Sequence, residues 1–291
     1  IMLSGAIGSL LPQMFKFSGT LTMIGFGEPA AGLIPLLGFF EAWWYQLPML
    51  LNFAAMVLVL VLMFKPDQPI HGKDFFQERL DSLGKMSRDE KKVVAILVVF
   101  FAFVLFYKYT PYPITWGLAI VPLLMAMPLV GCGTDKDMRK INYGFVIFVA
   151  SCMGIGATAV YLGLGGIVKD VMFPLLAGKS YYMFFALSWV FFFLCNFLMT
   201  PLAMEAAFTV PLVTIAMDLG LNPMAFYYFV LAAVDQIILP YEYALYMVGF
   251  AFGVMRLRDF VKLQATKCVV TTAIIFGICL PWWKFTGFLF M

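Results

Sequence analysis

The sequence predicts an all-α polytopic membrane protein, and three observations carry this prediction. Hydrophobic residues make up 63% of the 291 residues and charged residues only 12%, whereas soluble proteins average roughly 45–50% apolar and 25% charged residues. Several apolar runs reach the length of about 20 residues that a bilayer-spanning helix needs, and Trp43 to Phe64 holds 22 residues without a charge. These runs are continuous rather than alternating, which excludes a transmembrane barrel.

The basic residues indicate an orientation in the membrane rather than a nucleic-acid partner, since the net charge is only +3. Three loops, 65–92, 131–143 and 256–267, hold 14 of the 19 Lys and Arg residues. The positive-inside rule places these loops in the cytoplasm. We therefore expect a multi-pass protein of the cell membrane whose partners are the lipid bilayer and a small-molecule substrate.

Cysteine and histidine usage predicts neither a metal site nor an enzyme. The five cysteines form no CxxC pair, and the single histidine, His71, lies in a polar loop. A disulfide framework, a zinc site and a Ser-His or Cys-His catalytic pair are therefore not indicated, and we expect no cofactor. The chain opens inside an apolar stretch without a signal peptide, and we expect a fragment whose N-terminal part is missing.

The apolar runs form two parts separated by a polar linker. Residues 1–64 contain a broken helix and one span, and residues 65–92 form the linker, with an amphipathic helix at 74–83. The second part, residues 93–291, begins with spans at 93–107, 114–130 and 144–164. It continues with a hairpin at 181–217, a broken helix at 224–255 and a last span at 268–289. The second arm of the hairpin has only 15 residues, which favours a re-entrant hairpin.

Two apolar runs are interrupted, at Gly25 to Pro29 and at Leu239 to Glu242. Membranes tolerate broken backbone only where it lines a cavity, and half-helix ends bind ions there. The breaks come in the same order in the two parts, each before a full span. This arrangement predicts an inverted-repeat secondary transporter with discontinuous helices. A plain kink or close helix packing is the alternative for each break.

Acidic residues within apolar stretches are the candidate cation site, because each costs at least ~2.5–3.5 kcal/mol at the bilayer centre. We expect Na⁺ or H⁺ to be coupled through Glu28, Glu205, Asp235 and Glu242. We expect hydroxyls and free backbone amides at the breaks and the hairpin to hold the substrate, at Thr20, Thr22, Gly25, Gly27, Thr200, Pro201, Pro240 and Tyr241. Structural roles stay open for Glu205 and Asp235, and Lys16 either pairs with an acid or snorkels to an interface.

The segments around the breaks resemble the divalent anion:sodium symporter family, within the ion transporter superfamily. Residues 18–25, SGTLTMIG, are similar to the Gly- and Thr-rich stretch before the family's first xPPN turn, and residues 238–253 are similar to its second xPPN region. Residues 40–48, 141–146 and 258–260 resemble further elements. The likeness covers nearly the whole chain, as roughly the C-terminal three-fifths of such a carrier. It implies transport of dicarboxylates or related anions, by a homodimer.

The family's signature residues are replaced in this chain. Its hairpin tips carry Ser-Asn-Thr, which forms the sodium and carboxylate sites together with the xPPN turns. Here Pro201-Leu202-Ala203 stands at the second tip, while residues 26–29 and 243–246 replace the turns. We expect a cation-coupled transporter of an organic anion, carboxylate or dicarboxylate-like. A neutral or cationic substrate is one alternative, and a non-transporting subunit or sensor is the other.

Overall fold

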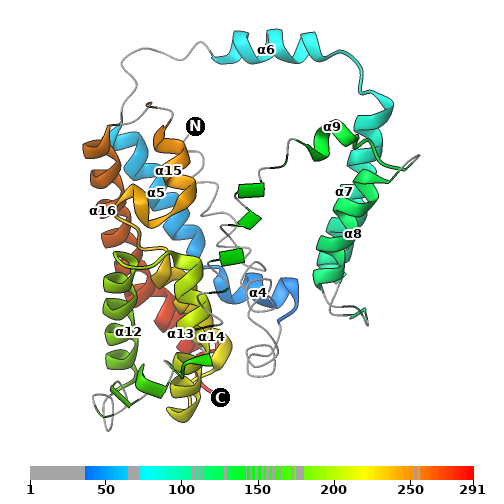
Figure 1. Ribbon diagram of the computed structural model, residues 1–291. Coiled ribbons are helices and arrows are strands. Elements are labelled where there is room, and N and C mark those ends of the chain that lie inside the picture. Colours follow the sequence, from blue (N-terminus) through cyan, green and yellow to red (C-terminus); the bar gives the residue numbers. More distant parts are fainter. Residues whose placement is uncertain are drawn as a thin grey trace. The chain divides into compact units, whose positions relative to one another are not determined.

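The computed structural model describes residues 37–64, 72–106, 114–127, 130–139, 180–251, 253 and 256–291, with scattered other residues between 109 and 174 (Figure 1). Within these residues the regular structure is helical, and Leu221 and Phe290 form an isolated bridge. This confirms the all-α prediction. The chain divides into a larger unit, residues 1–37, 41–63 and 144–291, and a smaller unit, residues 38–40 and 64–143.

The smaller unit contains the predicted polar linker and the helices that follow it. Its helices are α6 (Gly72–Leu83), α7 (Arg88–Phe106), α8 (Ile114–Ala126) and α9 (Asp135–Met138). Phe76 and Leu80 are exposed one turn apart on α6, as an amphipathic helix requires. Helices α7 and α8 pack together, and a Cβ atom on Gly117 would lie only 2.7 Å from the Phe103 ring. The glycine therefore permits their close approach.

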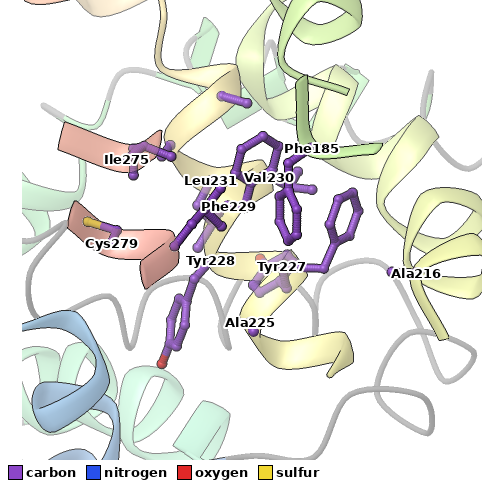
Figure 2. Close-up of a cluster of buried hydrophobic side chains, with 14 of the residues drawn as sticks. Phe185, Ala216, Ala225, Tyr227, Tyr228, Phe229, Val230, Leu231, Ile275 and Cys279 are labelled. Carbon is purple, nitrogen blue, oxygen red and sulfur yellow. The ribbon is translucent and has the colours of Figure 1, made fainter. Parts of the chain in front are cut away.

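The larger unit is built around α14 (Pro223–Val234), whose twelve residues are all buried. Helices α12 (Tyr181–Asn196) and α13 (Pro201–Asp218) both pack against it. Figure 2 shows side chains of α12 and of the last helical segment converging on α14. A helix that is apolar on every side belongs in the centre of a bundle, which is where this helix lies.

Aromatic rings fix the contact between α12 and α14. The ring centroids of Phe184 and Phe226 are 4.7 Å apart in a stacked arrangement, and those of Phe185 and Phe229 are 4.7 Å apart edge to face. All four side chains are fully buried. Such geometries add to the gain from burial itself, so these rings hold the first hairpin helix in place.

The predicted span from Trp43 to Phe64 is bent in its first third. Helix α4 (Phe39–Gln46) and helix α5 (Met49–Met63) meet at 57°. Pro48 lies between them, and its ring and missing N–H interrupt an α-helix. The indole Nε1 of Trp283 donates a 2.8 Å hydrogen bond to the carbonyl oxygen of Tyr45, which ties α4 to the end of the chain.

The last helical segment starts eleven residues before the predicted span of 268–289, so the predicted loop at 256–267 is mostly helical. Helix α16 (Leu257–Ile274) continues through a π-helical turn, η3 (Ile275–Cys279), into α17 (Leu280–Phe285). Pro281 explains the π-turn, since its ring cannot fit against the carbonyl four residues earlier. Helix α16 packs against α5.

Few helices in the described part of the chain are long enough to span a membrane. The continuous 29-residue helix Leu257–Phe285 is long and apolar enough, and the bent pair α4 and α5 qualifies when the two are taken as one broken span. Helices α12 and α14 and the residues Ala207–Asp218 are apolar but shorter. The predicted span at 144–164 lies largely outside the described residues, and the re-entrant character of the hairpin stays a prediction.

Candidate functional site

A non-helical segment follows α14, as the sequence predicts, although it begins earlier. Helix α14 ends at Val234, a 3₁₀ turn η2 spans Pro240–Glu242, and helix α15 begins at Ala244 (Ala244–Ala251). The residue before a proline avoids the helical region, and Leu239 has φ −109° and ψ 146° accordingly. We call residues 235–243 the break.

Glu242 stabilises the break through backbone contacts. Its carboxylate accepts hydrogen bonds from the backbone N–H groups of Ile238 at 3.1 Å and Leu239 at 2.9 Å. The side chain is 2% exposed. A buried backbone N–H without an acceptor is costly, so one carboxylate satisfies two donors that unwinding has released.

The hairpin tip, residues 196–200, lies beside the break. The side-chain amide of Asn196, the last residue of α12, donates to the carbonyl oxygen of Gln236 at 3.3 Å. From the break, the Tyr241 hydroxyl donates to the carbonyl oxygen of Phe197 at 3.4 Å. Two segments 40 or more residues apart in sequence therefore form one junction, which the sequence predicted only as two separate features.

Buried oxygen atoms without donors lie at this junction. Asn196 Oδ1 and Gln236 Oε1 are both buried without a hydrogen-bond partner among the described residues. Their amide nitrogens are occupied, since Gln236 Nε2 donates to the Ala232 carbonyl at 2.6 Å. Unpaired buried acceptors call for a bound water or ion, and hard cations prefer oxygen ligands of this type.

Thr200 and Pro201 start the second hairpin helix. Thr200 is the N-cap of α13, and its hydroxyl accepts a hydrogen bond from the Ala203 N–H at 3.4 Å. Pro201 follows at the first helical position, where its missing N–H is no loss. Of the predicted substrate residues, Thr200 and Pro201 thus lie at the N-terminus of α13, where backbone N–H groups favour anions, and Pro240 and Tyr241 lie in the break.

Asp235 forms an ion pair with a lysine that the sequence analysis assigned to a loop. Lys267 Nζ donates at 2.8 Å to Asp235 Oδ2 and also at 2.8 Å to the Asp235 carbonyl oxygen. Lys267 is 3% exposed and lies on α16. Asp235 itself caps the C-terminal end of α14. The break therefore meets an ammonium group from the last helix.

A polar stripe surrounds Lys267 on the buried face of α16. The Thr271 hydroxyl donates to Asn52 Oδ1 on α5 at 3.2 Å, while Asn52 Nδ2 and Gln264 Nε2 are buried without partners in the described part. A pattern of helical spacing in the sequence could have placed the lysine on a buried helix face, since it links Phe260, Gln264, Lys267 and Thr271.

Of the remaining predicted residues, Glu205 lies in the described part of the chain and the others lie outside it. Glu205 is buried on α13 and lies, like Asp235, within electrostatic reach of Tyr243. The first break and its residues lie outside the described residues: Lys16, Thr20, Thr22, Gly25, Gly27 and Glu28.

A small pocket elsewhere in the larger unit lacks the charged groups of an ion or anion site. Its lining includes Gln46, Tyr228, Leu231 and Trp283 and contains no charged side chain. A site for an ion and a charged substrate needs polar groups that converge, which the junction provides.

Discontinuous helices form the substrate and ion sites of many secondary transporters. The family model described as the sodium:sulfate symporter transmembrane region matches residues 36–289. The chain therefore belongs to this family of membrane transporters, which confirms its resemblance to the divalent anion:sodium symporters. No curated protein matches the chain. Membership places it in a membrane and among transporters.

Proposed function

We propose that the protein is a sodium-coupled anion symporter that holds its coupling ion where the hairpin tip meets the break. The unpaired oxygens Asn196 Oδ1 and Gln236 Oε1 carry this proposal. Unwound backbone and the C-terminal ends of half-helices coordinate Na⁺ in transporters with discontinuous helices. Sodium binding would supply the missing partner of both oxygens. The family's description supports sodium over a proton.

The anion would bind at the adjacent N-terminus of α13, near Thr200 and Tyr241. Helix N-termini present backbone N–H groups and a partial positive charge of about +0.5. The repulsion between an anion and the neighbouring carboxylates is reduced, because the ammonium group of Lys267 pairs with Asp235 and two backbone N–H groups donate to Glu242. This arrangement favours an anion over a neutral or cationic substrate.

Sulfate and an organic carboxylate or dicarboxylate share the chemistry that such a site recognises. The family description favours sulfate, whereas the expected signature residues for either anion are replaced in this sequence. Our proposal extends to an organic carboxylate because a helix N-terminus recognises any such anion. Uptake of labelled sulfate and succinate separates the two.

The proposal also covers the orientation of the protein in the membrane and its oligomeric state. The basic linker at 65–92 and the segment at 131–143 would face the cytoplasm of a cell-membrane protein, whereas Lys267 is buried and carries no weight for orientation. A homodimer is proposed on the family resemblance alone.

Asn196→Ala tests the coupling site. In proteoliposomes that contain the full-length protein, we expect the sodium concentration for half-maximal anion uptake to rise about tenfold, equal to about 1.4 kcal/mol. The maximal rate at saturating sodium should change little. Cys195→Ala, a neighbouring half-buried position on α12, is the matched control. A lower maximal rate with an unchanged sodium requirement would contradict the assignment.

A further inference from the structure

The ammonium group of Lys267 lies at the C-terminal end of a half-helix. It contacts the carboxylate and the backbone carbonyl of the same residue, Asp235, at 2.8 Å each. Helix α14 ends there, and a helix C-terminus carries a partial charge of about −0.5. Carbonyl and carboxylate oxygens at such an end are the ligands that a coupling cation takes in transporters with broken helices.

The surroundings of Lys267 differ from those of a purely structural ion pair. Buried ion pairs gain little stability over apolar replacements. The flanking amide nitrogens of Asn52 and Gln264 are buried without partners in the described part of the chain. The ammonium group thus lies in a polar stripe between α5 and α16 in which these two buried amide donors have no partner in the described part. Buried polar groups without partners call for a functional explanation.

We propose that Lys267 acts as a tethered cation. Its ammonium group occupies the position at the end of α14 that a sodium ion would otherwise occupy. This inference deepens the proposed function and rests on it for the nature of the ion. It predicts that the protein needs no free cation at Asp235, and that removal of the ammonium creates a sodium site there. The sodium proposed at Asn196 and Gln236 is separate, since it has other ligands.

Sodium-specific stabilisation of purified full-length protein in detergent tests this inference without any transport. The variants are Lys267→Met, which keeps the volume and removes the charge, and Lys267→Gln, which keeps a donor. Thermal unfolding is followed from low to 300 mM NaCl, with choline chloride at equal ionic strength as the reference. The double variant Asp235→Asn/Lys267→Met is the matched control, because it lacks the anionic ligand.

We expect each single variant to gain a sodium-dependent rise in Tm of about 4 °C beyond that of the wild type. The double variant should show only the wild-type response. An equal sodium response in wild type and in single variants would overturn the proposal. So would single variants that fail to fold at any sodium concentration while the double variant folds, because sodium then cannot replace the ammonium.

Uptake measurements distinguish failure of the tethered-cation proposal from failure of the symporter proposal. If the wild type takes up no anion but the Lys267 variants gain sodium-specific stabilisation, the symporter proposal fails and the tethered cation stands. If the wild type shows sodium-driven uptake but the variants gain no stabilisation, the tethered cation fails and the symporter proposal stands.

Discussion

The carboxylates around the break are held by different kinds of contact. Asp235 binds an ammonium group, whereas Glu242 accepts two backbone N–H groups. An acid inside an apolar run stands out, so both residues could be found from the sequence. Lys267 was missed, because Arg256, Arg258 and Lys262 precede it and make the segment resemble a polar loop. Helical spacing could have placed Lys267 on a buried face, but its pairing with Asp235 is visible only in three dimensions.

Glu242→Ala should loosen the break. It removes the acceptor of two backbone donors, and each buried donor left unsatisfied costs about 1–3 kcal/mol. Hydrogen exchange measured by mass spectrometry should therefore accelerate in peptides that cover residues 235–243. Glu242→Gln, which keeps one acceptor oxygen, should have a smaller effect, and the exposed Glu78→Gln none. Unchanged exchange in the alanine variant would show that the carboxylate does not hold the break.

The start of α7 should respond to acid. The backbone N–H of Ser87 donates to the Glu90 carboxylate at 2.6 Å, and the Ser87 hydroxyl accepts from the Glu90 N–H at 3.2 Å. This capping box, chiefly its backbone hydrogen bond, lowers the pKa of Glu90. A lowered pKa in the folded state stabilises the helix end above the pKa of an unfolded glutamate, about 4.3. This stabilisation is lost as the pH falls through the lowered pKa.

Amide exchange at residues 88–91, corrected for its intrinsic pH dependence, checks this expectation. Protection should be higher at pH 7 than at pH 3, and Glu90→Gln, which removes the titrating carboxyl group, should abolish the difference. Glu78→Gln, at an exposed glutamate of α6, is the matched control. Equal protection at both pH values in the wild type would contradict the assignment.

Helix boundaries follow the proline positions more closely than the apolar runs. Pro48, Pro201 and Pro223 each stand just before or at a helix start, and Pro281 lies two residues after the π-turn. The interrupted helix after Met224 could be predicted because Pro240 breaks it. Its earlier end at Val234 could not, since the Asp235 cap depends on Lys267 from a distant helix. The bend between α4 and α5 was missed because hydropathy alone ignores Pro48.

The contact between α12 and α14 should dominate the stability of the larger unit. Phe185→Ala removes a fully buried ring that meets Phe229 edge to face, and such truncations cost about 3–5 kcal/mol. Thermal unfolding in detergent should show a clearly lower Tm for this variant. Val190→Ala, at a 53% exposed position on the same helix, should change it little. Equal shifts for both variants would show that the buried rings do not fix the hairpin helix.

At the scale of the whole molecule, composition alone predicts the membrane, and element order predicts the family that the match over residues 36–289 confirms. The site is less predictable, because its parts come from α12, the break and α16, which meet only after folding. The hairpin tip and the break carry polar groups, among them Asn196, Gln236 and Glu242. The functional question is therefore whether these groups still couple sodium to an anion.

Uptake of labelled sulfate and succinate by proteoliposomes that contain the full-length protein answers this question most directly. An inward sodium gradient should drive accumulation of at least one anion, and an equal potassium gradient should not. Equal uptake under both gradients would contradict sodium coupling. No uptake of either anion under the sodium gradient would contradict the symporter proposal and favour a membrane protein that keeps the carrier fold without transport.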